Sequence, residues 1–203
     1  MSLESLSGVD IYILDQVQRG RLTADMRILD AGCGNGRNMR WFLASGAQVF
    51  GVDTKPESVA AVRKLAADLA PGIPADNFRE EAVDSLSFED ASMDAVICCA
   101  VLHFARDDAD FDAMVDSLWR VLRPGGVLFC RLASSTGMED RMVNIEGNRF
   151  TMPDGTDRYL VNETRLMDVT HKLGGKLLDP LKTTLVQNLR SMTTWVVRKA
   201  ESA

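Results

Sequence analysis

The sequence predicts one α/β domain with a doubly wound sheet of seven strands, mostly parallel, with an antiparallel C-terminal strand and helices on both faces. The chain has 203 residues, of which 46% are apolar and 26% charged, as expected for one globular domain. Short apolar runs alternate with helical patterns along most of its length, which is typical of a parallel sheet. The last two apolar runs are joined by a short link, as in an antiparallel hairpin.

Apolar periodicity places the first elements. Apolar residues recur at helical spacing over 10–20 and again over 39–43, which predicts two helices. Short apolar runs at 27–30 and 49–52 predict strands on either side of the second helix. Together these segments form a strand–helix–strand unit, the building block of a parallel sheet.

A longer helix is predicted after the second strand. Thr54 lies three residues before Glu57, a capping-box pattern, and Pro56 suits the first turn of a helix. The helical pattern stops near Pro71. Residues 77–83 then predict a short third strand.

The second half of the sequence contains the centre of the sheet. Residues 95–102 are apolar throughout, as expected for a strand covered on both faces. A helical stripe from Phe111 stops at Pro124, and residues 127–132 resume a strand pattern. The periodicity then fades, and we interpret residues 134–160 as an insertion over the end of the sheet where an active site would lie. The remaining expected elements are a helix over 163–173 and hairpin strands over 176–186 and 191–197.

Composition disfavours several classes of function. Twenty-three basic and 29 acidic residues give a net charge of −6, so we expect no nucleic-acid partner. No apolar run approaches the roughly 20 residues of a membrane helix, and no leader pattern opens the sequence, so we expect a cytoplasmic protein without a membrane partner. The cysteines lack the spacing of metal ligands, which predicts core positions and no metal for Cys33, Cys98, Cys99 and Cys130.

A glycine-rich stretch follows the first predicted strand, where ligands bind in parallel sheets. Gly32, Gly34 and Gly36 allow the backbone to approach a ligand, although a turn required only for packing is the alternative. Asp53 ends the second strand, where a carboxylate accepts hydrogen bonds from both hydroxyls of a ribose. Arg37 stands where the dinucleotide fingerprint requires glycine, which disfavours a nicotinamide-dependent oxidoreductase.

Four segments resemble, in order, motifs of the class I S-adenosylmethionine-dependent methyltransferases. They are residues 28–36 (ILDAGCGNG), 49–53 (VFGVD), 88–96 (FEDASMDAV) and 118–126 (LWRVLRPGG). The third departs from the family pattern because Met93 replaces the usual Phe. Residues 36–38 are similar to the small-molecule, tellurite-resistance-like branch of the family. The resemblance implies a Rossmann-like fold with S-adenosylmethionine as cofactor.

The resemblance also implies a role for each matching position. Asp30 and the backbone of residues 32–36 would hold the amino-acid end of the cofactor, and Asp53 its ribose. Thr54 would lie beside the adenine. The cofactor-binding set implied in this way is Asp30, Gly32, Cys33, Gly34, Gly36, Asp53, Thr54, Glu81, Ala82, Val83, Cys99 and Ala100.

Within this set, two carboxylates compete for one role. Glu81 is the first candidate to accept the adenine amino group and Asp84 is the second. Val83 would lie against the adenine ring. Cys99 and Ala100, at the end of the fourth strand, would pass near the sulfonium.

Methyl transfer places few demands on a protein. A methyl group on a positively charged sulfur needs mainly an aligned nucleophile in a dry pocket, so no metal or covalent intermediate is required. A base is needed only if the acceptor must lose a proton, and His103 is the candidate catalytic residue. A packing role is the alternative for His103. His171 is interpreted as a cation at the end of a helix.

Tyr12, Arg131 and Arg190 are predicted to contact the acceptor. Arg131 lies at the end of the fifth strand and Arg190 in the link before the antiparallel last strand, both on the expected ligand side. This placement favours an anionic acceptor, with ion pairs to surface carboxylates as the alternative. Tyr12 and the N-terminal segment 1–26 are expected to close over the cofactor as a lid, with a plain amphipathic helix as the alternative.

The favoured hypothesis is an enzyme, a single-domain methyltransferase over residues 1–203 that transfers a methyl group by in-line displacement to a small-molecule acceptor. A non-catalytic module that binds the same cofactor in a regulatory role is the second hypothesis. A nicotinamide-dependent oxidoreductase is the third. The sequence fixes neither the acceptor and its reacting atom nor the oligomeric state.

Overall fold

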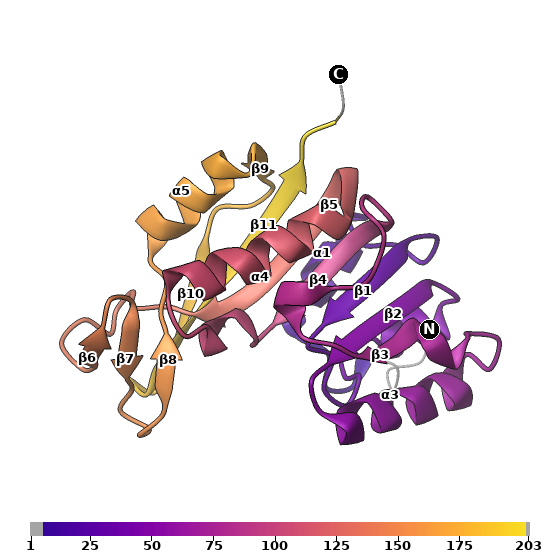
Figure 1. Ribbon diagram of the computed structural model, residues 1–203, viewed down its shortest axis with the longest axis horizontal. Coiled ribbons are helices and arrows are strands. Elements are labelled where there is room, and N and C mark those ends of the chain that lie inside the picture. Colours follow the sequence, from indigo (N-terminus) through magenta and orange to yellow (C-terminus); the bar gives the residue numbers. More distant parts are fainter. Residues whose placement is uncertain (1–5, 202–203) are drawn as a thin grey trace.

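A computed structural model describes residues 6–201 of the chain (Figure 1). The first five residues of the predicted lid and the last two residues of the predicted domain lie outside the described residues. Among residues 6–201, no helix combines the length and the apolar composition needed to cross a membrane. The helices are α1 (Ile11–Gln18), α2 (Arg40–Ala44), α3 (Pro56–Leu69), α4 (Asp108–Val121) and α5 (Glu163–Lys172), with 3-10 turns η2 (Ala75–Asn77), η3 (Val83–Ser85) and η4 (Leu102–Phe104).

The main sheet has the predicted doubly wound, mostly parallel topology. Its strand order is β10-β11-β5-β4-β1-β2-β3, and β9 pairs with the far end of β11. All pairs from β3 to β5 are parallel, whereas β11 is antiparallel to its neighbours. The strands are β1 (Arg27–Ala31), β2 (Gln48–Asp53), β3 (Phe78–Glu80), β4 (Met93–Cys99), β5 (Leu122–Ala133), β9 (Gly175–Leu177), β10 (Lys182–Val186) and β11 (Arg190–Lys199). The order reverses between β1 and β4, and ligands bind at such a switch point.

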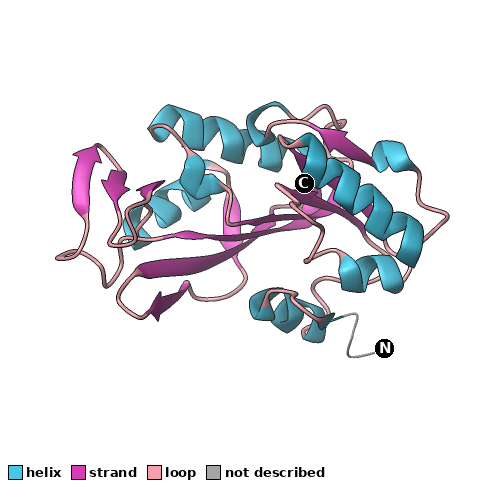
Figure 2. Cartoon of the chain, turned by 90° about the horizontal axis from the view of Figure 1, so that it is seen from below, coloured by secondary structure: helices cyan, strands magenta, loops and turns pink. Residues whose placement is uncertain are grey.

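Helices cover both faces of the sheet, and this explains the apolar runs (Figure 2). On one face, Leu29 of β1 packs in a cluster with residues of α4 and α5. On the other face, Ile28 packs in a cluster with residues of α1, α2 and α3. Successive side chains of a strand point to opposite faces, so a strand covered on both sides is apolar at nearly every position. The same alternation places Asp30 on the face of α1, α2 and α3.

The start of α3 differs from the prediction. Its N-cap is Lys55, which makes no side-chain cap, and Pro56 is the first helical residue. The Oδ1 atom of Asp53 accepts a hydrogen bond from the Lys55 amide at 3.0 Å and so orders the turn before the helix. The predicted capping box between Thr54 and Glu57 is therefore wrong.

The C-terminal hairpin is confirmed, with one correction. β10 and β11 are antiparallel, and the link between them contains Gln187 and Asn188 with φ angles of 48° and 56°. The expected strand over 176–186 is divided into β9 and β10. Pro180 lies between them, and proline lacks the backbone N–H that a continuous ladder requires.

The segment expected as an insertion forms a small sheet of its own. Its antiparallel strands are β6 (Val143–Glu146), β7 (Arg149–Thr151) and β8 (Asp157–Tyr159). The strands are short, and every residue of β6 is exposed. An exposed strand lacks the alternation of apolar and polar residues, and β7 and β8, with three residues each, are too short to show it, so the sequence predicted none of them.

We expect Phe129→Ala to lower the free energy of unfolding by about 3–5 kcal/mol, because it leaves a cavity in the sheet. Phe129 is fully buried in the central part of β5. Leu185→Ala, at a position on β10 that is 45% exposed, is the control and should change stability by less than about 0.5 kcal/mol. Urea unfolding followed by circular dichroism measures both, and equal midpoints would contradict the assigned core.

Candidate functional site

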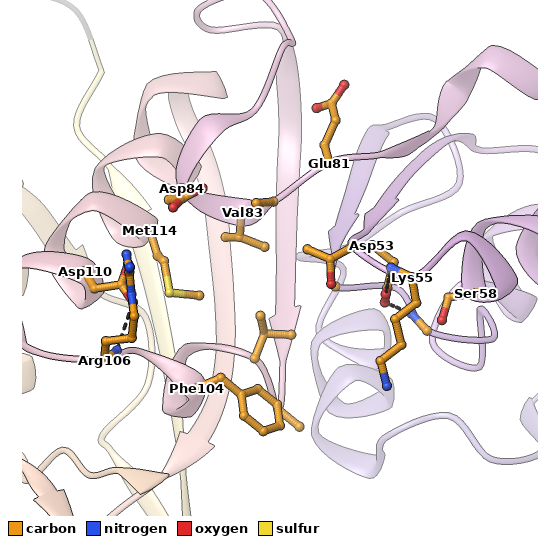
Figure 3. Close-up of a pocket in the computed structure, with 16 residues that line it drawn as sticks. Asp53, Lys55, Ser58, Glu81, Val83, Asp84, Phe104, Arg106, Asp110 and Met114 are labelled. Carbon is orange, nitrogen blue, oxygen red and sulfur yellow. Dashed lines mark hydrogen bonds and ion pairs between the residues drawn. The ribbon is translucent and has the colours of Figure 1, made fainter.

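The carboxyl ends of β1, β2 and β4 meet at a cavity of about 620 Å³ (Figure 3). Figure 3 shows Asp53 and Lys55 on one side of the cavity and Val83 and Met114 on the other. The predicted cofactor residues that line it are Gly32, Gly34, Asp53, Thr54, Glu81, Ala82, Val83 and Ala100. Four predicted residues do not line it, namely Asp30, Cys33, Gly36 and Cys99.

Backbone amides hold the carboxylate of Asp53 at the end of β2. Its Oδ2 atom accepts a hydrogen bond from the Gly34 amide at 2.9 Å, and its Oδ1 atom accepts one from the Lys55 amide. Each carboxylate oxygen has a second acceptor position, so Asp53 retains the capacity to accept two hydroxyl groups. This is the chemistry that a ribose requires.

Glycine is required at the three positions of the loop for different structural reasons. A Cβ atom at Gly32 would lie 2.2 Å from a methyl group of Val101, and one at Gly36 would lie 2.9 Å from a methyl group of Val62. The packing interpretation therefore accounts for these two positions. Gly34 has open space where a Cβ would be, with φ at 52°. Of the three, Gly34 best fits a direct approach of the backbone to a ligand.

Asp30 is a buried carboxyl group beside the loop. Asp30 is only 2% exposed, and its Oδ2 atom has no hydrogen-bond partner. Burial raises the pKa of Asp30 from 3.8 to about 7, opposed by the charge of Arg37 and supported by that of Asp53. Burial also raises the pKa of the nearby Cys99 thiol to about 12, so Cys99 stays neutral and is a poor nucleophile.

The two carboxylates considered for the adenine point in different directions. Glu81 accepts hydrogen bonds from the amide and the hydroxyl of Ser87, and it forms an ion pair with Arg79 at 3.8 Å. Figure 3 shows its carboxylate directed away from Asp53. Asp84 also lines the cavity, and its only hydrogen bond among the described residues comes from the neighbouring Ser85 hydroxyl. The geometry therefore favours Asp84 over Glu81.

A second cavity, of about 350 Å³, adjoins the first and shares Ala100 and Phe104 with it. It brings together the predicted residues His103, Arg131 and Arg190. Sequence reasoning missed other residues of its lining, in particular Arg37, Met152, Asp154, Thr156 and Arg158. Most of these come from the insertion, where the sequence lacks periodicity. In the sequence, Arg37 stood out as a departure from the dinucleotide fingerprint and as part of the family-like segment 36–38, not as a candidate to contact the acceptor.

His103 is buried and its acceptor atom is occupied. Its Nδ1 atom accepts a hydrogen bond from the Ala133 amide at 3.3 Å. Burial and, to a smaller extent, the charge of Arg158 together lower the pKa of His103 to about 4. A neutral imidazole has one unprotonated nitrogen, so this arrangement leaves Nε2–H as a donor.

The start of α1 is attached to the second cavity. Asp10, the N-cap of α1, forms an ion pair with Arg131 at 3.3 Å. The Arg131 guanidinium also lies over the Tyr12 ring. The Tyr12 hydroxyl is 2.7 Å from the Thr184 hydroxyl of β10. Tyr12 does not line either cavity; it contacts the arginine that does.

The sequence family described as "Methyltransferase domain" matches residues 29–130, which is about half of the chain. The chain belongs to this methyltransferase domain family. The matched segment contains most of β1 and β5, all of β2, β3 and β4, and every residue that lines the larger cavity.

Similar proteins agree with this membership. A ubiquinone biosynthesis O-methyltransferase of Xanthomonas axonopodis pv. citri (strain 306) is 33% identical over 67% of this chain and 56% of the relative. The chain therefore spans less than two thirds of the length of the curated relatives it matches. The finer similarity to the tellurite-resistance-like branch stays a prediction.

Solved structures of methyltransferases share the fold. A S-adenosylmethionine-dependent methyltransferase from Methanosarcina mazei has a TM-score of 0.73 and 20% identity, covering 92% of this chain and 98% of that one. The Burkholderia thailandensis 1,6-didemethyltoxoflavin-N1-methyltransferase, solved with its substrate and S-adenosylhomocysteine, has a TM-score of 0.71 and 18% identity, covering 97% of this chain and 79% of that one. At this level of identity the similarity establishes the fold alone.

We expect Asp30→Asn to change how stability depends on pH. Without ligand, the folded chain keeps Asp30 protonated up to about pH 7, whereas the unfolded chain ionises it near pH 4. Between these values the folded state binds more protons, so this group's contribution to the free energy of unfolding falls as the pH rises, by up to about 1.4 kcal/mol per pH unit. Asparagine cannot ionise, so the variant gains stability relative to the parent chain over this interval.

The measurement is urea unfolding of both proteins at a series of pH values from 4 to 8. His103 has the opposite effect, because its pKa is lowered on folding, but it is present in both proteins and cancels in the difference. Asp68→Asn, at an exposed position of α3, is the matched control and should give a flat difference. A flat difference for Asp30→Asn as well would refute the raised pKa.

Proposed function

We propose that this chain is a S-adenosylmethionine-dependent methyltransferase that acts on a small molecule. The observation that carries this proposal is the pair of adjoining cavities at the carboxyl edge of the sheet. The larger is lined by more acidic than basic residues, and the smaller by four arginines. A cationic cofactor and a separate acceptor would occupy the two cavities and meet near Ala100 and Phe104.

The residues of the larger cavity, together with Asp30, which is buried beside the glycine-rich loop and outside the lining, fit this cofactor. Asp30 has a buried oxygen without a partner, and an ammonium group is the kind of donor that would restore its hydrogen bonding and its charge. Asp53 would accept the ribose hydroxyls, and Gly34 would lie against the amino-acid end. Val83 and Met114 offer apolar surface to the adenine ring, and Asp84 replaces Glu81 as the acceptor for its amino group.

When bound, S-adenosylmethionine supplies a methyl group on a positively charged sulfur. The chain's own part is to align the acceptor and to exclude water. Phe104 contributes to both cavities and is positioned to cover the point where they join. His103, neutral and with Nδ1 occupied, would orient the acceptor through Nε2–H rather than remove a proton.

The family supports the reaction more strongly than it supports any acceptor. The named relatives and neighbours include an O-methyltransferase and an N-methyltransferase. Arg131, Arg158, Arg190 and most of the other residues lining the smaller cavity lie outside the segment that the family matches. The acceptor atom therefore stays open, and the cytoplasmic location and the lack of a nucleic-acid partner stay predictions.

Titration calorimetry with S-adenosylmethionine and S-adenosylhomocysteine tests the proposal directly. Binding of both, with no binding of NADH, is expected. Binding of neither would refute the proposal. Methyl release with a panel of acceptors then separates an enzyme from a non-catalytic module.

We expect Asp53→Ala to weaken binding of S-adenosylhomocysteine by about 1–3 kcal/mol, because two hydrogen bonds to a charged acceptor are lost. Asp68→Ala, an exposed carboxylate of α3 away from the cavity, is the control and should bind normally. Circular dichroism checks that both variants fold. An unchanged affinity of Asp53→Ala would show that this carboxylate does not hold the ribose.

A further inference from the structure

The smaller cavity is strongly cationic. Arg37, Arg131, Arg158 and Arg190 line a space of about 350 Å³, and Asp154 is the one acidic residue of its lining. Asp154 already accepts a hydrogen bond from the Thr156 amide at 3.0 Å. Four guanidinium groups therefore surround a cavity that holds a single, partly engaged carboxylate.

Most of these arginines have no carboxylate within ion-pair distance, although the charges of Arg158 and Arg190 help to lower the pKa of Asp154. Within residues 6–201, Arg37, Arg158 and Arg190 form no ion pair within 4.0 Å. Arg131 pairs with Asp10 at 3.3 Å, yet its Nε atom is buried without an acceptor. Arg190 therefore does not form the surface ion pair that was the alternative to a role in binding. Arg131 does form an ion pair, but its Nε–H remains free to donate a hydrogen bond.

A further polar group of the lining, His103, is also a donor. His103 is neutral, and its Nδ1 atom is occupied by the Ala133 amide, which leaves Nε2–H. The charge of Arg158 contributes to the lowered pKa of His103, as expected for a positive electrostatic potential around the ring. A cavity that presents positive charge and hydrogen-bond donors complements a ligand that carries negative charge and acceptors.

We propose that the smaller cavity is an oxyanion subsite, and that the methyl acceptor is a small molecule bearing a carboxylate or phosphate group. The inference rests on the proposed function, because that function places the acceptor in this cavity. The planar guanidinium fork matches the oxygens of carboxylates and phosphates, often through two parallel hydrogen bonds. Ligand pockets range from about 300 to 1,000 Å³, so this cavity accepts a compact acceptor.

Calorimetry at constant ionic strength, with three probes, tests the subsite. Inorganic phosphate and benzoate represent the two kinds of oxyanion, and benzamide is the neutral counterpart of benzoate. We expect at least one anion to bind and benzamide not to bind, and the anion that binds more tightly identifies the preferred oxyanion. Arg190→Gln should weaken the binding about fivefold to tenfold. Arg198→Gln, which removes an exposed arginine at the other end of β11, should leave it unchanged.

Three results would overturn the subsite: no anion binding at millimolar concentrations, equal binding of benzamide and benzoate, or equal behaviour of Arg190→Gln and Arg198→Gln. Each titration is repeated with S-adenosylhomocysteine present, which separates the two proposals. If S-adenosylhomocysteine binds but the binding of the anions does not depend on Arg190, only the subsite proposal is refuted. If S-adenosylhomocysteine does not bind but the binding of the anions depends on Arg190, the proposed function is refuted and the oxyanion subsite stands.

Discussion

The candidate site depends on one electrostatic constraint, the burial of Asp30 at the end of β1. The alternation of side chains along β1 directs this residue into the layer of α1, α2 and α3, where little water reaches it. An unpartnered polar atom in such a place costs about 1–3 kcal/mol, and an ionised carboxylate costs more. A ligand that brings a positive charge would remove that cost. The carboxyl is thus a preformed and energetically unfavourable group whose relief would contribute to binding.

The topology of the sheet separates the charges of the two cavities. On one side of the switch point, β1 carries Asp30 as its next-to-last residue and β2 ends in Asp53. On the other side, β5 carries Arg131 near its end, and β11 begins with Arg190 because it runs antiparallel. Asp30 and Asp53 therefore lie on one half of the edge and Arg131 and Arg190 on the other. Arg37 lines the smaller cavity from the loop after β1. Ala100, which has a φ angle of 64°, lies between the halves and lines both cavities.

The sequence predicted the part of this design that depends on local pattern. Buried strands and amphipathic helices leave a periodic pattern, so β1, β2, β4 and α4 were found close to their observed limits. Asp53 was found because it directly follows an apolar run. The capping box failed because a neighbouring side chain, Asp53, orders the turn instead. Glu81 was preferred to Asp84 because sequence does not show that Ser87 and Arg79 engage its carboxylate. Arg158 was missed because its strand, β8, has only three residues and is too short to show a periodic pattern.

The division between conserved fold and specific site follows from the same geometry. The segment matched by the methyltransferase family supplies the larger cavity, whereas the smaller one is completed by the insertion and the C-terminal hairpin. A fold alone does not determine an acceptor, since specificity lies in the groups attached to it. In this chain the start of the N-terminal helix also contributes to the smaller cavity, because Asp10, the N-cap of α1, forms an ion pair with Arg131. An oxyanion that entered the smaller cavity would compete with Asp10 for that arginine, so its binding would be coupled to the position of α1.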